Sequence, residues 1–175
     1  MNGNGITSVA GAVRAMQIIR LALVMGVVSF AGVVLFLKLT GGGPKGPAIP
    51  NPLFPNFPLV LLIGAFFGVT AVLASFVLPG VLEANGRKQV AAKNLSNEDE
   101  VDLALVQVAQ TLSVIRGALV EGVSFLLTIS SMIEGHWWGL MWLVPLIALQ
   151  LITMPTQTSI EEWIRTQKEW MRMER

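Results

Sequence analysis

The chain has 175 residues, of which 53% are hydrophobic and only 13% are charged, and its mean hydropathy is +0.66. A soluble domain carries roughly 25% charged residues, so this composition favours a helical bundle in lipid over a water-soluble globule. The net charge of +1 excludes a broad positive field, and nucleic acid is therefore not expected as a partner. The chain has no cysteine, which excludes disulfides and thiol chemistry, and we expect neither a metal nor another cofactor.

A first transmembrane hairpin is predicted over residues 18–82, after a glycine-rich N-terminal segment at 1–17. Its first apolar run, at 18–39, is long enough to cross a hydrocarbon core of roughly 30 Å. A cleaved signal peptide is the alternative interpretation, because Arg14 precedes the apolar region.

The segment between the first two apolar runs, residues 41–58, contains six prolines and four glycines. Such a composition is incompatible with a regular helix, so we expect an extended exterior loop. Phe54 and Phe57, each followed by a proline, could instead form a lid on the bundle or on the lipid surface.

The second apolar run, at 59–82, carries a strip of small side chains on one face. This strip predicts close packing against another helix, and it consists of Gly64, Gly68, Ala71 and Ser75. We expect Pro79-Gly80 to break or kink this helix at its end.

Residues 83–111 are predicted to form a polar cytoplasmic linker and the start of the next helix. The linker opens with a basic patch made of Arg87, Lys88 and Lys93. Ser96 is expected to cap the helix, and the acids that follow suit the positive end of the helix dipole: Glu98, Asp99, Glu100 and Asp102. The acidic cluster is interpreted as a solvated helix start, with docking of a basic partner or a divalent ion as the alternative. We expect the helix to continue without a break into the third span.

A second transmembrane hairpin is predicted over residues 112–155, with a tight connection at Glu134-Gly135-His136. The fourth apolar run, at 137–154, begins with a cluster of tryptophans typical of the water–lipid interface: Trp137, Trp138 and Trp142. His136 is interpreted as an interface residue, because one imidazole beside one acid is too small a ligand set for structural zinc.

Residues 156–175 are predicted to form an amphipathic cytoplasmic tail helix, with Ser159 and Glu162 as a capping box. A helix of this kind lies on a membrane surface, and binding to a partner protein is the alternative.

Basic residues predict the orientation of the four spans. Nine of them fall on the side that holds both termini and the middle linker, against only Lys38 and Lys45 on the other side. By the positive-inside rule, we expect a multi-pass protein of the cytoplasmic (inner) membrane with both termini in the cytoplasm.

The first and third spans resemble each other in sequence. Residues 19–27 (IRLALVMGV) and 115–123 (IRGALVEGV) are identical at seven of nine positions, which predicts two tandem hairpins related by duplication. Convergence on a similar composition is the alternative. Arg20 and Arg116 occupy equivalent positions, where each guanidinium is expected to reach lipid headgroups while its stem stays in lipid.

Glu121 is the residue whose chemistry most clearly suggests a functional role. It lies near mid-membrane on a polar stripe whose members share one helix face: Ser113, Gly117, Glu121, Ser124, Thr128 and Ser131. Gln150, at a similar predicted depth on the fourth span, is the expected hydrogen-bond partner. An ionisable group at the bilayer centre costs several kcal/mol unless it is paired, neutral or wet. Glu121, Gln150 and Ser124 are thus a candidate proton- or cation-binding site, or else a contact that holds helices or subunits together.

The doubled I-R-x-A-L-V-x-G-V motif resembles uncharacterised small bacterial four-span integral membrane proteins with a duplicated hairpin. That resemblance covers most of residues 14–158 and implies no established activity. The chain also faintly resembles the proteolipid (c-type) subunits of rotary ATPases, which carry one membrane carboxylate; Glu121 would be that position. The carboxylate here lies on the first helix of its hairpin, whereas that family places it on the second.

The sequence thus predicts an all-α polytopic membrane protein with four transmembrane helices in two tandem hairpins and an amphipathic C-terminal helix. No nucleophile–base set is visible, so we expect no enzymatic activity. We expect a structural or assembly component of a membrane complex, present in the lipid bilayer as a homo-oligomer or as a subunit of that complex. The alternatives are proton or cation translocation through Glu121 and, more distantly, a proteolipid-like rotor subunit.

Overall fold

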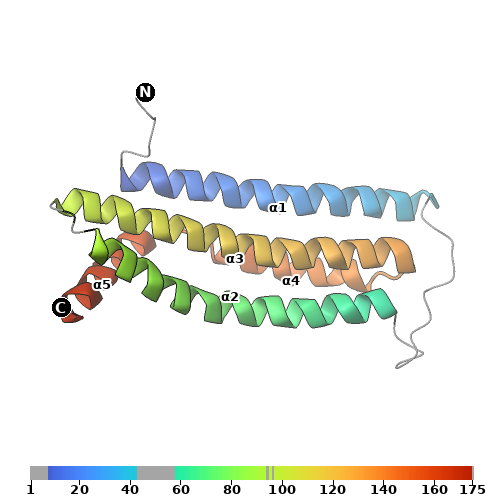
Figure 1. Ribbon diagram of the computed structural model, residues 1–175. Coiled ribbons are helices and arrows are strands. Elements are labelled where there is room, and N and C mark those ends of the chain that lie inside the picture. Colours follow the sequence, from blue (N-terminus) through green and yellow to red (C-terminus); the bar gives the residue numbers. More distant parts are fainter. Residues whose placement is uncertain (1–7, 43–57, 94, 96, 175) are drawn as a thin grey trace. The chain divides into compact units, whose positions relative to one another are not determined.

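The computed structural model describes residues 8–42, 58–93, 95 and 97–174 (Figure 1). Within these ranges the chain forms five helices and no strand: α1 (Val9–Leu39), α2 (Leu59–Ala92), α3 (Glu98–Glu134), α4 (Trp138–Ile152) and α5 (Gln157–Met173). The prediction of an all-α protein is confirmed for this part of the chain. The expectations for residues 1–7, the loop segment 43–57 with Lys45, Phe54 and Phe57, the Ser96 cap and Arg175 lie outside the described residues.

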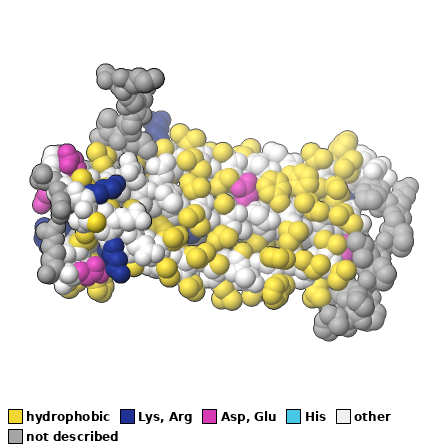
Figure 2. All heavy atoms as spheres, in the orientation of Figure 1, with side chains coloured by type: hydrophobic (Ala, Val, Ile, Leu, Met, Phe, Trp, Pro, Cys, Tyr) yellow, Lys and Arg dark blue, Asp and Glu magenta, His cyan; other side chains and the backbone are white. Residues whose placement is uncertain are grey.

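Three of the helices, α1, α2 and α3, are long and apolar enough to cross a membrane. The fourth apolar run forms α4, which has only 15 residues, or roughly 22 Å at 1.5 Å per residue. The number of candidate spans rises to four only if α4 and α5 together count as one bent span. Hydrophobic side chains cover much of the face shown in Figure 2, and large ones such as Phe66 and Phe76 remain 70% exposed. Such a surface is typical of a protein embedded in lipid.

The third helix is continuous from its polar start into the apolar span, as predicted. Its first N–H groups are capped by Asn97, whose side-chain oxygen accepts a hydrogen bond from the Asp99 backbone N–H at 3.2 Å. Acidic residues fill the first turn, and the helix ends where Gly135 adopts a left-handed φ of +73°. All these signals are local in the sequence, which is why the course of α3 could be predicted.

The expected break at Pro79-Gly80 is wrong. Pro79 lies inside α2, which continues to Ala92, so residues 83–92 of the predicted linker are helical. A proline removes one backbone donor from a helix, and packing beyond it can offset that loss. Val90 belongs to a buried cluster, and a Cβ on Gly86 would overlap Val108 of α3 at 2.6 Å. The last turns of α2 are therefore held by contact with α3.

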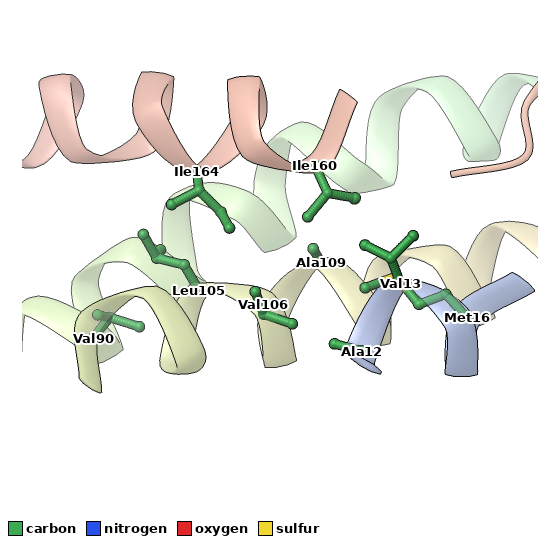
Figure 3. Close-up of a cluster of buried hydrophobic side chains, with 9 residues drawn as sticks. All are labelled: Ala12, Val13, Met16, Val90, Leu105, Val106, Ala109, Ile160 and Ile164. Carbon is green, nitrogen blue, oxygen red and sulfur yellow. The ribbon is translucent and has the colours of Figure 1, made fainter. Parts of the chain in front are cut away.

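The chain divides into two compact units, and α1, α2 and α3 each contribute to both. The first unit comprises residues 1–20, 76–116 and 154–175. Its core is a cluster of apolar side chains from four helices, shown in Figure 3: Ala12, Val13, Met16, Val90, Leu105, Val106, Ala109, Ile160 and Ile164. Because the last two come from α5, the C-terminal helix is part of this core.

The amphipathic tail helix exists as predicted, but its cap and its apolar face differ from expectation. The capping box pairs Thr156 with Ser159, instead of Ser159 with Glu162. Thr156 takes the extended backbone conformation of an N-cap and accepts the Ser159 N–H at 3.2 Å, which places the helix start three residues earlier. Ile160 and Ile164 are buried within the protein, so the centre of the apolar face does not lie on lipid.

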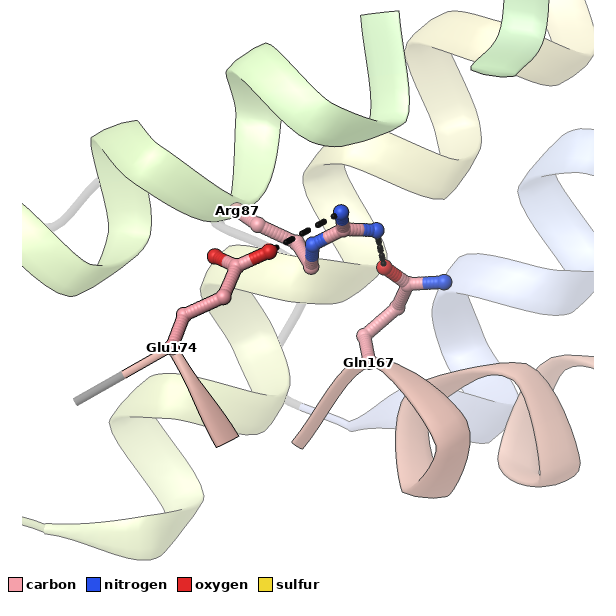
Figure 4. Close-up of polar contacts among 3 residues, drawn as sticks. All are labelled: Arg87, Gln167 and Glu174. Carbon is pink, nitrogen blue, oxygen red and sulfur yellow. Dashed lines mark hydrogen bonds and ion pairs between the residues drawn. The ribbon is translucent and has the colours of Figure 1, made fainter. Parts of the chain in front are cut away.

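Polar contacts on both sides of this apolar face connect α5 to α2 and α3. Arg87 of α2 donates a hydrogen bond to Gln167 at 2.9 Å and pairs with Glu174 at 3.4 Å (Figure 4). Lys168 pairs with Asp102 and, at 4.0 Å, with Glu98. Part of the predicted acidic cluster therefore has a basic partner from its own chain.

The second unit comprises residues 21–75 and 117–153. The predicted small-residue strip of α2 packs on α3 there, since a Cβ on Gly64 or Gly68 would lie 3.2 Å from Leu127 or Val123. Helix α4 approaches α3 more closely still. A Cβ on Gly139 would overlap the Leu127 carbonyl oxygen and the Ser131 hydroxyl, so only glycine fits at this crossing.

Two charged side chains close one end of the second unit. The buried Glu134 carboxylate, 6% exposed, accepts hydrogen bonds from the backbone N–H groups of Val60 at 2.7 Å and Leu61 at 3.0 Å. Lys38 donates to the carbonyl oxygen of Gly135 at 2.6 Å and lies over the ring of Trp137. An acid thus caps the start of α2 and a base caps the end of α3, in agreement with the two helix dipoles.

Candidate functional site

The polar stripe of α3 lies mostly in the second unit, and most of its hydroxyl groups are already satisfied. Ser124 and Thr128 are fully buried, and each donates to the carbonyl four residues earlier, at 2.8 Å and 2.7 Å. The Ser131 hydroxyl accepts the backbone N–H of Leu140 at the start of α4, at 3.0 Å. These side chains are small and internally bonded, so their role in the structure is to let neighbouring helices approach α3.

Glu121 differs from Ser124, Thr128 and Ser131 because it is only half-buried. It lies on the side of α3 that faces α1, where a Cβ on Gly26 would be 3.5 Å from its Oε1 atom. One turn further along, the rings of Phe125 and Phe30 pack at 5.5 Å between centroids. Gly26 thus lies against the Glu121 carboxyl group, beside an aromatic pair.

No hydrogen bond or ion pair of the Glu121 side chain occurs within the described part of the chain. An ionised carboxylate in an apolar surface costs several kcal/mol. A charge on Glu121 would therefore need water, or a group outside the described residues, to compensate it.

The predicted contact between Glu121 and Gln150 is not formed. Gln150 is 2% exposed, and its Oε1 atom is enclosed without a hydrogen-bond donor among the described residues. The reason is geometric: α4 packs on Leu127 and Ser131, and Leu127 lies six residues beyond Glu121, or about 120° around the helix. Glu121 and Gln150 were matched by their predicted depth in the membrane, but their side chains do not lie on facing helix surfaces.

The two arginines of the sequence repeat have different environments within the first unit. Arg20 is only 3% exposed, and its Nε atom donates to the Ser113 hydroxyl at 3.3 Å. Arg116, one turn beyond Ser113, is exposed. The two equivalent positions thus differ in burial, and the expectation that both guanidinium groups reach lipid headgroups stays a prediction.

The remaining residues predicted for helix packing lie at or near helix contacts. Gly64 and Gly117 are buried, while Gly68, Ala71 and Ser75 are half-buried. Ala71 lines an apolar groove with Leu119 and Gly122.

Sequence reasoning missed Glu134 as a buried cap of another helix. A signal was present, because an acid in the last turn of α3 opposes the dipole of that helix and needs a partner elsewhere. His136 is exposed in the connection that follows. Among the described residues, no group of three or more His, Cys, Asp or Glu side chains is arranged to hold a metal ion.

Comparison with protein-family models, curated proteins and solved structures gives no match to this chain. The fold and the site therefore define a class only. In its described part the chain is an all-α protein with three to four candidate membrane-spanning helices, and α3 carries a half-buried carboxyl group, Glu121, that has no hydrogen-bond partner among the described residues.

Proposed function

We propose that this protein is a non-enzymatic, multi-pass membrane protein that serves as a structural or assembly component of a membrane complex. Glu121 is its polar contact with a partner helix. One observation carries the proposal: this carboxyl group is half-buried on an apolar surface and has no partner within the described residues.

The environment of Glu121 favours an interface over a conducting path. Ser124 and Thr128, the stripe residues that follow it, use their hydroxyl protons on their own helix. A relay would need groups free to exchange hydrogen bonds, whereas a partner helix needs one exposed polar group on a surface that can approach closely. The half-buried Glu121 carboxyl group supplies that polar group.

The proposed topology has four spans, arranged as two tandem hairpins, with α4 completing the second hairpin. Support comes from the basic residues, nine of which share one side under this arrangement. The positive-inside rule then places both termini in the cytoplasm of a bacterial cell, with the spans in its inner membrane. The seven identities between residues 19–27 and 115–123 support the duplicated hairpin.

A partner at this surface must offer a hydrogen-bonding group in lipid. A second copy of the chain meets that requirement with its own Glu121, because two neutral carboxyl groups can each donate and accept one hydrogen bond. A homo-oligomer is therefore the simplest assembly, and a helix of another membrane protein that carries an amide or hydroxyl is the other.

The natural lack of cysteine makes a crosslinking test direct. Met25→Cys places one thiol beside Gly26 on an exposed position and leaves Glu121 intact, while Leu73→Cys on α2 is a matched exposed control. In native membranes, a photoreactive maleimide on Met25→Cys should capture a second copy or one defined membrane protein. Glu121→Leu should abolish capture, whereas Glu121→Gln should retain it because the amide still hydrogen-bonds. Equal capture at Leu73→Cys, or capture that survives Glu121→Leu, would refute the proposal.

A second candidate is translocation of protons or cations, which the enclosed Oε1 atom of Gln150, without a donor among the described residues, favours. A buried acceptor of this kind can bind a water molecule or a cation. Purified protein in liposomes would then carry a proton or cation flux that Gln150→Leu abolishes, and a wild-type protein without flux would exclude this function.

A further inference from the structure

Arg20 is a buried cation that has no counter-charge in the described part of the chain. The residue is buried, with only 3% of its surface exposed. Its one hydrogen bond among the described residues runs from Nε to the neutral Ser113 hydroxyl. The ion pairs of that part of the chain join Arg87 to Glu174 and Lys168 to two acids, and none involves Arg20.

A buried charge without a counter-charge is strongly unfavourable, so an anion is expected beside Arg20. The two terminal nitrogens are free to bind one. Neither donates a hydrogen bond within the described residues, and neither is among the fully enclosed polar atoms, so both keep some access to the surface.

A second cation belongs to the same site. Ser113 and Arg116 are three residues apart on α3 and therefore share a face of that helix. Because Arg20 donates to Ser113, Arg116 lies one helical turn of α3 away from that contact. Two neighbouring guanidinium groups, one buried and one exposed, favour a ligand with a full negative charge and several acceptor oxygens.

The position of the site along the helices indicates where that ligand comes from. Arg20 lies about 28 Å before the end of α1 at Leu39, and Arg116 about 27 Å before the end of α3 at Glu134, at 1.5 Å per residue. Each distance is close to the thickness of the hydrocarbon core, roughly 30 Å. If the C-terminal ends of α1 and α3 lie at one membrane surface, Arg20 and Arg116 therefore lie at the level of the lipid phosphates of the opposite surface.

We propose that Arg20, Ser113 and Arg116 bind the phosphate group of an anionic phospholipid. Arg20 and Arg116 neutralise the phosphate, and the Ser113 hydroxyl orients the buried guanidinium. A zwitterionic lipid is a poorer ligand because Arg116 repels its ammonium group. This inference depends on residence in a membrane, which is part of the proposed function, but it does not depend on Glu121 or on a partner helix.

The test uses the full chain, purified in a neutral detergent and titrated with phosphatidylglycerol or phosphatidylcholine of identical acyl chains. Native mass spectrometry measures how many lipids remain bound. The wild type should retain phosphatidylglycerol about tenfold more tightly, which corresponds to one strong charge-assisted contact. Arg116→Ala should lose most of that preference and Arg116→Lys only part of it, while Arg165→Ala, an exposed arginine of α5, should keep it.

A second measurement addresses the buried residue. Phosphatidylglycerol should raise the unfolding temperature of the wild type and leave that of Arg20→Met unchanged. If Arg20→Met does not fold, the comparison of Arg116→Ala with Arg165→Ala alone supports or refutes the site. A wild type without lipid preference, or Arg116→Ala with an undiminished one, overturns the proposal. Displacement of the lipid by inorganic phosphate also overturns it, because the ligand would then be a free anion. The crosslinking of Met25→Cys is independent of all these results, so the two proposals fail separately.

Discussion

Replacing Glu134 tests whether the carboxyl group of α3 holds the start of α2. The first backbone N–H groups of a helix have no partner within the helix, and here Val60 and Leu61 donate theirs to the two oxygens of Glu134. The Ser130 hydroxyl donates a third hydrogen bond to the same carboxylate at 3.2 Å. Glu134→Gln keeps one acceptor oxygen and turns an amide NH₂ toward these donors, whereas Glu134→Ala removes both acceptors.

The size of the effect follows from the hydrogen bonds that each substitution removes. A hydrogen bond to a charged group contributes about 1.5–3 kcal/mol, and the helix dipole favours a negative charge at this end by up to about 1 kcal/mol. Because such contributions are not additive, we expect Glu134→Gln to lower the free energy of unfolding by about 1–2 kcal/mol. Glu134→Ala, which leaves two donors unpaired in a buried site, should lower it by about 2–4 kcal/mol.

The assay is unfolding in mixed micelles of neutral detergent and sodium dodecyl sulfate, followed by tryptophan fluorescence and circular dichroism. Glu100→Gln is the matched control, since Glu100 is an exposed acid in the first turn of the same helix. It should change the stability by less than about 0.5 kcal/mol. If Glu134→Ala were as stable as Glu100→Gln, the carboxyl group would contribute nothing to the start of α2, contrary to the prediction.

The same unfolding assay checks two further predictions. Gly139→Ala should destabilise the protein by about 1–3 kcal/mol, because the new methyl group overlaps Leu127 and Ser131. Gly32→Ala, where nothing lies within 4 Å of the new methyl group, should have little effect, and equal stabilities would contradict the close crossing of α3 and α4. Ile164→Ala should cost about 2–5 kcal/mol and expose α5 to proteolysis. Lys168→Met, which removes only partly exposed ion pairs, should cost less than about 1 kcal/mol, and a larger loss than that of Ile164→Ala would show that charge holds α5.

Sequence periodicity predicted the features that depend on neighbouring residues along the chain. The apolar runs form helices. The acidic first turn marks the start of one continuous α3, and the glycine after Glu134 marks its end. The strip of Gly64 and Gly68 was expected to serve helix packing because small residues at this spacing let another helix approach closely, and both glycines lie against α3. The predicted helix end at Pro79 was wrong because the effect of this proline depends on the tertiary contacts of the next turns, which the local sequence does not contain.

Pairs between helices could not be predicted in the same way. Depth along a span follows from counting residues, but the facing side of a helix depends on where its neighbours pack. Glu121 and Gln150 were matched by depth, yet α4 packs about 120° away from Glu121. For the same reason the contact between Glu134 and the start of α2 was not predicted, since those residues are more than seventy positions apart.

A comparison of the charged side chains within the apolar helices separates internal contacts from external ones. Glu134 and Lys38 have their partners in the described chain, where each caps the end of a helix. Arg20 and Glu121 have no partner of opposite charge there, although one is buried and the other half-buried. Lipid surroundings penalise such groups, so we propose that each marks a surface where something outside the described residues completes the structure. The two side chains carry opposite charges when ionised, and the two proposed ligands differ accordingly. Arg20 would bind an anionic phosphate, and Glu121 would contact a helix that can hydrogen-bond to a carboxyl group.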